Sequence, residues 1–156
     1  MTPRNRSLLL SVPILVCCLP WFVPAHAALG GNAGSVLEDV DLLHGTSESS
    51  FSGGFEVIEI TTDNGLRVRE YLAPAGTLFG IAWNGPVMPD LRQLLGSRFT
   101  QYTAALRAQD HPGRHRVVAL SVPGLVVQSA GHLRAYSGRA YLPAAMPDGI
   151  APALIR

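Results

Sequence analysis

The chain has 156 residues, in which 12 basic residues stand against 11 acidic ones, so its formal net charge at pH 7 is only +1. All of the basic residues are arginine, since the sequence contains no lysine. The balanced charge argues against a nucleic-acid-binding protein, and the lack of lysine excludes Schiff-base chemistry and the lysine of a phosphate-binding loop.

The N-terminal segment has the three parts of a secretory signal peptide. Arg4 and Arg6 form a basic start, residues 7–23 are almost wholly apolar, and residues 24–27 end in an A-x-A motif. This order predicts cleavage after residue 27 and export of residues 28–156 to the periplasm or the medium of a Gram-negative bacterium.

Two alternatives remain open for this segment. It is a membrane anchor if it stays attached, but Pro13 and Pro20 interrupt the apolar run, which is short of the ~20 residues that span a bilayer. Lipidation of Cys17 or Cys18 is the second alternative, although neither follows the small residue that a lipoprotein signal favours. Cleavage leaves one domain, residues 28–156, without cysteine and therefore without thiol chemistry. No second apolar run in these residues approaches the length of a membrane span.

The first predicted element of the exported chain is a helix over residues 36–44. Ser35 and Glu38 have the spacing of a capping box, and Gly45 predicts the end of the helix. Residues 45–54 are rich in serine and glycine, which predicts a flexible loop.

Three strands are predicted next. Residues 55–60 and 66–72 alternate between apolar and polar side chains, and the Asn-Gly pair in the turn 63–65 predicts a hairpin with positive φ at both central positions. The alternation places Glu70 on the apolar face, for which the pattern offers no reason. Residues 77–83 predict a third and more buried strand.

A second helix is predicted from Pro89 to about Gln109. Proline suits the first helical turn, and Asp90 suits the positive end of the helix dipole. Gly96 either costs about 1 kcal/mol inside this helix or ends a first, shorter helix.

The last part of the chain predicts further strands at 117–122, 125–128 and 132–142, with a turn at 129–131. The order of elements predicts an α+β domain, in which a small, mostly antiparallel sheet of five to six strands packs with two helices.

Arginine and tyrosine recur on the predicted strands and form the strongest binding-site candidate, because both bury area and keep a polar group available. The candidate residues are Arg67, Arg69, Tyr71, Arg134, Tyr136, Arg139 and Tyr141. The alternative is a solvated sheet face with cross-strand ion pairs, such as Arg67 or Arg69 with Glu56 or Glu59.

Catalytic candidates are weaker. Ser129 and His132 are close in sequence, and Asp90 offers a third member of a serine-hydrolase triad. Residue 127 is valine, however, where the nucleophile elbow requires glycine for its tight turn.

No cofactor or metal is predicted. His111 and His115 have the helical spacing of two metal ligands, but Pro112 and Gly113 between them disfavour a helix. No glycine-rich loop has the strand–turn–helix setting of a dinucleotide site.

Three stretches resemble an exported bacterial family, the domain of unknown function numbered 2844. The stretches are residues 28–31, residues 69–76 continuing through Trp83 to 88–96, and residues 124–132 with 138–143. The resemblance covers nearly all of the exported chain except residues 46–54. It implies export and a single domain, and it brings no assigned activity, cofactor or catalytic residue.

The sequence therefore predicts an exported, non-enzymatic module that binds an envelope protein or another envelope component. A small serine hydrolase that uses Ser129 and His132 is the alternative.

Overall fold

The computed structural model describes residues 29–109 and 117–156. The predicted signal peptide, His111 and His115 lie outside these residues. The described strands are β1 (Gly45–Ser52), β2 (Phe55–Thr62), β3 (Arg67–Leu72), β4 (Leu78–Gly85), β5 (Val117–Val122), β6 (Leu125–His132) and β7 (Ala135–Tyr141). The described helices are α1 (Ala33–Leu43), α2 (Leu91–Leu95) and α3 (Phe99–Ala108).

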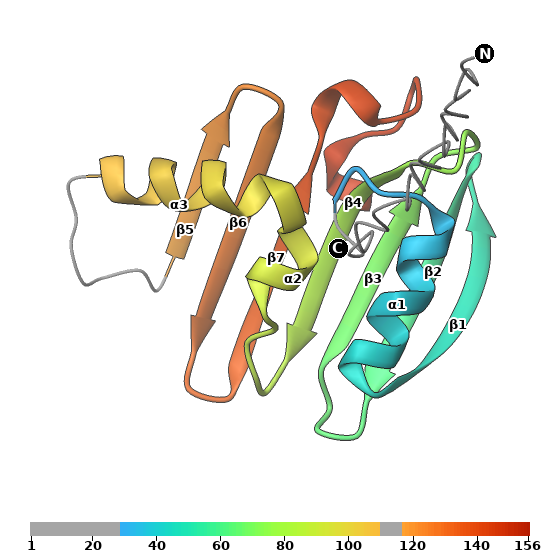
Figure 1. Cartoon of the computed structure of the whole chain (residues 1–156), viewed down its shortest axis with the longest axis horizontal. Helices are drawn as coiled ribbons and strands as arrows, with labels where there is room; N and C mark the ends of the chain where they lie inside the picture. The colour runs from blue at the N-terminus through green and yellow to red at the C-terminus, as the bar shows by residue number, and fades with distance from the viewer. Residues whose placement is uncertain (1–28, 110–116) are drawn as a thin grey trace, which may run out of the picture.

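All seven described strands belong to one antiparallel sheet, in the order β1-β2-β3-β4-β7-β6-β5. Each half of the domain is a helical segment followed by a meander, since α1 precedes β1 to β4, and α2 and α3 precede β5 to β7. The last strands of the two meanders, β4 and β7, pair at the centre of the sheet. The three helices lie together on one face (Figure 1).

The predicted α+β class and the predominantly antiparallel sheet are confirmed, but the sheet has more strands than the predicted five to six. The additional strand is β1, in the segment 45–54 that was expected to be a flexible loop. It pairs with β2 along its whole length, from Gly45 opposite Thr62 to Ser52 opposite Phe55. Backbone pairing with a strong strand overrides the weak strand propensity of a serine-rich segment at a sheet edge.

Helix α1 begins earlier than predicted because Asn32, and not Ser35, caps it. The Asn32 Oδ1 accepts a hydrogen bond from the Gly34 N–H at 2.9 Å, and the Ser35 hydroxyl donates to the Asn32 carbonyl at 2.5 Å. At the other end His44 takes the left-handed conformation (φ 50°), so Gly45 is free to begin β1. The predicted capping box at Ser35 and glycine stop at Gly45 are both wrong.

The hairpin between β2 and β3 is confirmed, although its turn is longer than a two-residue Asn-Gly turn. Gly65 has positive φ (83°) and Asn64 does not. The buried Thr62 closes the loop, because its hydroxyl oxygen accepts from the Leu66 N–H at 3.1 Å.

The second predicted helix is divided at Gly96, which confirms the alternative that this glycine ends a first, shorter helix. Helix α2 ends there with φ 49°, a 3-10 turn follows over Gly96–Arg98, and α3 continues from Phe99. Asp90 caps α2, since its carboxylate accepts from the Arg92 N–H at 2.8 Å.

The turn predicted at 129–131 is wrong, because those residues continue β6 and pair with β7 as far as Gly131 opposite Tyr136. The chain reverses instead at residues 133–134, where Arg134 has positive φ (64°).

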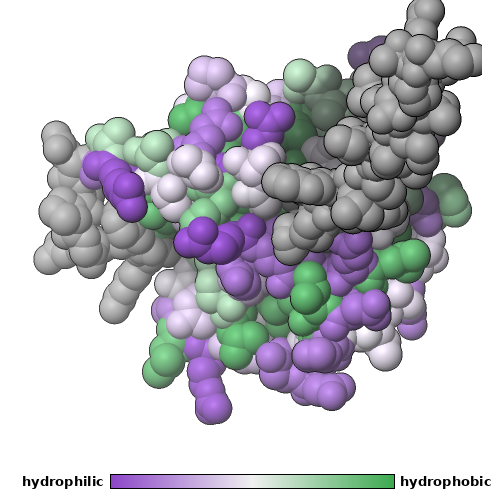
Figure 2. Space-filling model, viewed as in Figure 1, coloured by the Kyte–Doolittle hydropathy of each residue, from purple (hydrophilic) through white to green (hydrophobic). Residues whose placement is uncertain are grey.

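The main core lies between the sheet and the helices. Its fully buried members include Leu95 from α2 and Ile60, Val68 and Ile81 from the sheet. The ring of Trp83 lies over Gly138, where an added Cβ would be 2.3 Å from the indole Cζ2, so that position has room for glycine only. Hydrophilic and hydrophobic residues mix over the visible outer surface of this side (Figure 2).

A smaller apolar cluster lies on the opposite face of the sheet. It contains Phe55, Tyr71, Phe79, Ala82, Tyr141 and Ile155. Ile155 comes from the C-terminal segment, residues 143–156, which packs on this face through two 3-10 turns and no strand. The sheet is therefore covered by helices on one side and by part of its own C-terminal segment on the other.

Candidate binding surface

The face of the sheet opposite the helices, which we call the open face, carries two cross-strand rows of side chains. The first row is Glu59, Arg69, Ala82, Arg139, Gln128 and Ala119. The second row is Thr61, Arg67, Asn84, Ser137, Ala130 and Val117. Alternation along each strand brings these residues to one side, so several arginines share a surface otherwise built from small and polar side chains.

Arg69 joins the sheet to the C-terminal segment. Its Nε lies 2.5 Å from the Glu59 Oε2, and its Nη1 donates to the backbone oxygen of Arg156 at 2.8 Å. The Tyr71 hydroxyl donates to the same oxygen at 2.8 Å and accepts from the Arg156 N–H at 3.0 Å. The predicted cross-strand pair is thus confirmed for Arg69 with Glu59, whereas Glu56 lies on the other side of β2.

Arg139 plays the corresponding part on β7. Its Nε donates to the Gln128 Oε1 at 2.8 Å, and its Nη1 donates to the backbone oxygens of Pro152 at 2.7 Å and Ile155 at 3.3 Å. Two guanidinium groups therefore hold backbone oxygens of the same short segment.

Five of the seven predicted binding residues lie on the open face, namely Arg67, Arg69, Tyr71, Arg139 and Tyr141. The other two, Arg134 and Tyr136, line a depression together with Arg67. Tyr71 and Tyr141 are buried, so they support the apolar cluster and are not exposed. Tyr136 alternates with the core residue Ala140 and belongs to the helix-facing side of β7. Arg134 lies in the β6–β7 turn. One continuous Arg/Tyr patch is therefore not formed.

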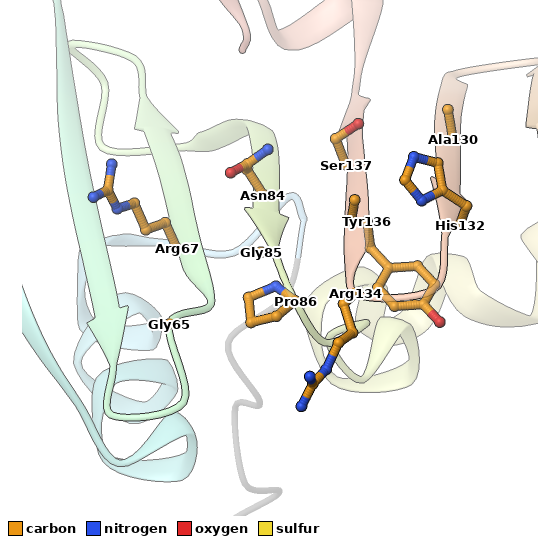
Figure 3. Close-up of a pocket in the computed structure, with 12 residues that line it drawn as sticks. Gly65, Arg67, Asn84, Gly85, Pro86, Ala130, His132, Arg134, Tyr136 and Ser137 are labelled. Atoms are coloured by element: carbon orange, nitrogen blue, oxygen red, sulfur yellow. The ribbon is translucent and has the colours of Figure 1, made fainter.

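What the open face does present is a hollow, which we call the arginine hollow. It consists of two adjoining depressions of about 660 and 730 Å³ that share Asn84, Ala130 and Ser137. Figure 3 shows Arg67 on β3, Asn84 on β4 and Ser137 on β7 around the first depression. Small side chains form its floor, and longer ones form its rim.

The charged side chains that line the arginine hollow are all basic. Arg67, Arg134 and His132 line the first depression, and Arg69, Arg139 and Arg156 line the second. Neither lining contains an aspartate or glutamate among the described residues. In the part of the chain that the structure describes, the guanidinium groups of Arg67, Arg134 and Arg156 have no acidic partner. A chain of nearly balanced charge thus collects five cations around one hollow.

Sequence reasoning missed Asn84, Ser137 and Arg156 as members of this surface. Asn84 looked like the end of a strand, and Ser137 carried no signal beyond strand alternation. Arg156 reaches the surface only because Ile155 is anchored beside it. The register across β3, β4 and β7 was the missing information.

The serine-hydrolase trio is not assembled. Ser129 lies within β6 and shares the helix-facing side with Val127. His132 is three residues further along the strand, so it lies on the open face and lines the arginine hollow. Asp90 caps α2 on the other side of the sheet.

A second group of ionisable side chains lies inside the main core. Asp39 of α1 and Glu70 of β3 are both completely buried, and the Gln93 amide of α2 donates to the Asp39 Oδ1 at 2.6 Å. Burial raises the pKa of Glu70 to about 10, and its hydrogen bond to Asp39 and the charge of Asp39 add to this effect. This raised pKa favours the protonated, neutral form of Glu70 at neutral pH, and a neutral carboxyl group costs less to bury than a charged one.

No group of three or more histidine, cysteine, aspartate or glutamate residues with metal-binding geometry occurs among residues 29–109 and 117–156. No helix in these same ranges is long and apolar enough to span a membrane.

Comparison with known proteins gives one match. No curated protein and no solved structure matches the chain. A family model described as "Protein of unknown function (DUF2844)" matches residues 25–155, which include all described strands of the sheet and every residue that lines the arginine hollow except Arg156. The chain therefore belongs to this family of proteins of unknown function.

Proposed function

We propose that residues 28–156 form an exported, non-enzymatic binding module, and that its arginine hollow binds an acidic segment of a partner protein in the envelope. The observation that carries this proposal is the lining of the hollow, which has five arginines and one histidine and no acidic residue among those described. The signal-peptide features of residues 1–27 support the exported location.

Carboxylates suit the donors that this hollow offers. Arg67 and Arg134 are exposed, and each guanidinium presents a planar set of N–H donors that bind a carboxylate in a bidentate manner. The nearby Arg69 and Arg139 already bind backbone oxygens of the C-terminal segment. This face therefore already holds a polypeptide segment through its backbone oxygens, which favours a protein ligand over a lipid or a polysaccharide.

The test is a fluorescence-anisotropy titration of the exported chain with a labelled oligoglutamate peptide, using oligoglutamine of equal length for comparison. We expect saturable binding of oligoglutamate that weakens as salt increases. Replacing both Arg67 and Arg134 by alanine should weaken it about tenfold, which corresponds to ~1.4 kcal/mol. The matched control is Arg107→Ala, since Arg107 is an exposed arginine at the end of α3, away from the hollow.

Equal binding of the two peptides, or equal binding by the parent and the double variant, would overturn the proposal. So would a chain that ignores oligoglutamate and binds vesicles of anionic phospholipid, because the hollow would then serve a membrane surface.

A further inference from the structure

The C-terminal segment is attached to the open face in the way that a bound peptide is attached. Within residues 147–156 the backbone hydrogen bonds are local, as in Ile150 N–H to the Pro147 oxygen and Leu154 N–H to the Ala151 oxygen. Among the described residues no backbone hydrogen bond joins this segment to a strand. Side chains of the sheet, namely Arg69, Tyr71 and Arg139, supply the polar contacts instead.

One side chain anchors the segment. Ile155 is completely buried, whereas its neighbour Leu154 remains 46% exposed. The Ile155 side chain fills a notch over Gly80, where an added Cβ would lie 2.9 Å from the Ile155 Cδ1. Tyr71 and Tyr141 belong to the same apolar cluster. The notch therefore selects a bulky aliphatic side chain and depends on glycine at position 80.

The residue after the anchor fits its surroundings poorly. Arg156 lines a small cavity of about 70 Å³ together with Arg67 and Arg69, so the segment brings a third positive charge beside two others. An acidic residue at the same place would instead form charge-assisted hydrogen bonds with the guanidinium groups, and such bonds are shorter and stronger than neutral ones. The C-terminal segment thus supplies the aliphatic anchor, Ile155, but it places a positive charge, Arg156, where a negative one would bind better.

We propose that Arg69, Tyr71, Gly80 and Arg139, which we call the tail seat, form a polypeptide-binding site that residues 151–156 occupy until a partner segment displaces them. The partner segment carries a bulky aliphatic residue followed directly by an acidic residue. The inference rests on the proposed function, because the acidic part of the same partner continues into the arginine hollow. The C-terminal segment then regulates access to the full surface.

The test uses three labelled hexapeptides and measures their binding to the exported chain by fluorescence anisotropy. The first peptide copies residues 151–156 with glutamate in the last position. The second keeps the natural arginine there, and the third has glutamate in the last position and alanine in place of the isoleucine. Ile155→Ala in the protein releases the internal anchor and leaves the seat intact, whereas Gly80→Ala fills the seat.

We expect the Ile155→Ala protein to bind the first peptide about tenfold more tightly than the parent does, a difference of ~1.4 kcal/mol. The second peptide should bind several-fold more weakly than the first, and the third should not bind measurably. The Gly80→Ala protein should bind the first two peptides several-fold more weakly than the parent does, because the added methyl group occupies part of the seat. Arg156→Glu, at an exposed position outside the tail seat, gives the internal segment the acidic residue of the partner and should therefore weaken binding of the first peptide several-fold.

Near-ultraviolet circular dichroism of the buried Trp83 reports whether each variant is folded. If Ile155→Ala is unfolded, Arg156→Glu decides the question alone. Equal affinity of the folded variant and the parent for the first peptide would overturn the tail-seat proposal. Binding of oligoglutamate that depends on Arg67 and Arg134 would persist in that case, so the proposed function would stand; loss of that binding would remove both.

Discussion

The two faces of the sheet use polar side chains in opposite ways. On the helix-facing side two carboxyl groups are completely buried, since Asp39 and Glu70 lie in the core, where burial raises the pKa of Glu70 and the Gln93 amide donates to Asp39. On the open face Arg67 and Arg134 are exposed, and Arg69 and Arg139 hold a segment that makes no strand. One face is closed by packing, and the other exposes two of its arginines.

The comparison teaches where this domain keeps its stability. Helices α1, α2 and α3 cover the larger apolar cluster, which includes Val68, Ile81 and Trp83. The smaller cluster is closed by one anchor, Ile155, at the end of a segment without ladder hydrogen bonds. If most of the unfolding free energy comes from the helix-facing core, the C-terminal segment can leave the open face without unfolding the domain.

The pH dependence of stability is the sharpest test of the helix-facing side. The pKa of Glu70 is raised from 4.5 to about 10 by burial and by Asp39, so the folded protein holds a proton that the unfolded chain releases in this range. The contribution of Glu70 to the unfolding free energy is therefore complete below pH 4.5 and is lost as pH rises towards 10, by up to ~1.4 kcal/mol per pH unit.

Denaturant unfolding at pH 5 and pH 8 should show a loss of about 4 kcal/mol in the parent, and Glu70→Gln should remove most of that difference. Glu48→Gln, at an exposed position of β1, is the control. A parent whose unfolding free energy is the same at both pH values would show that the pKa of Glu70 is not raised in the folded protein.

Substitution of two isoleucines compares the packing under the helices with the packing under the C-terminal segment, because Ile81 and Ile155 are both completely buried. Ile81→Ala leaves a cavity between sheet and helices and should cost about 4 kcal/mol of unfolding free energy. Ile155→Ala should cost only about 2 kcal/mol, since the segment above it can shift. Equal losses in urea titrations would mean that the C-terminal segment is as rigid a cover as the helices.

Two glycines make the same comparison through overpacking. Gly138→Ala places a Cβ 2.3 Å from the Trp83 ring and 2.7 Å from the Gln128 backbone oxygen, and should cost about 3 kcal/mol. Gly80→Ala meets only the Ile155 side chain, whose Cδ1 lies at 2.9 Å and whose Cγ1 lies at 3.3 Å, and this side chain can shift with its segment, so about 1 kcal/mol is expected. Thermal unfolding followed by circular dichroism measures both, and a larger effect at Gly80 would reverse the assignment of the rigid face.

The smallest effect on stability belongs to the proposed binding residue itself. Arg67 is exposed and has no hydrogen-bond acceptor among the described residues, so Arg67→Ala should change the unfolding free energy by less than about 0.5 kcal/mol. A marked destabilisation would show that Arg67 is structural, and the loss of peptide binding in its variants could then no longer be assigned to a direct contact.

Much of the fold was predictable where the signal is local. The alternation of residues 66–72, the turn ending at Gly65 and the break at Gly96 each depend on neighbouring residues, and each prediction was confirmed in outline. The pairing of Arg69 with Glu59 was also within reach, because the hairpin sets their register. Four of the seven candidate binding residues lie on β7 or in the turn before it, and the other three lie on β3, as the predicted strands placed them.

The remainder required the tertiary structure. The segment 45–54 becomes a strand only because β2 offers it a partner, and the strand at 129–131 exists only because β7 runs beside it. By itself the sequence determined the periodicity, the hairpin and the positions of the charges. The tertiary structure decided that Glu70 meets Asp39, and that Tyr71 is bonded to a residue 85 positions away. The physical reason is that local turns and alternation act over a few residues, whereas burial and hydrogen bonding depend on which distant segments pack together.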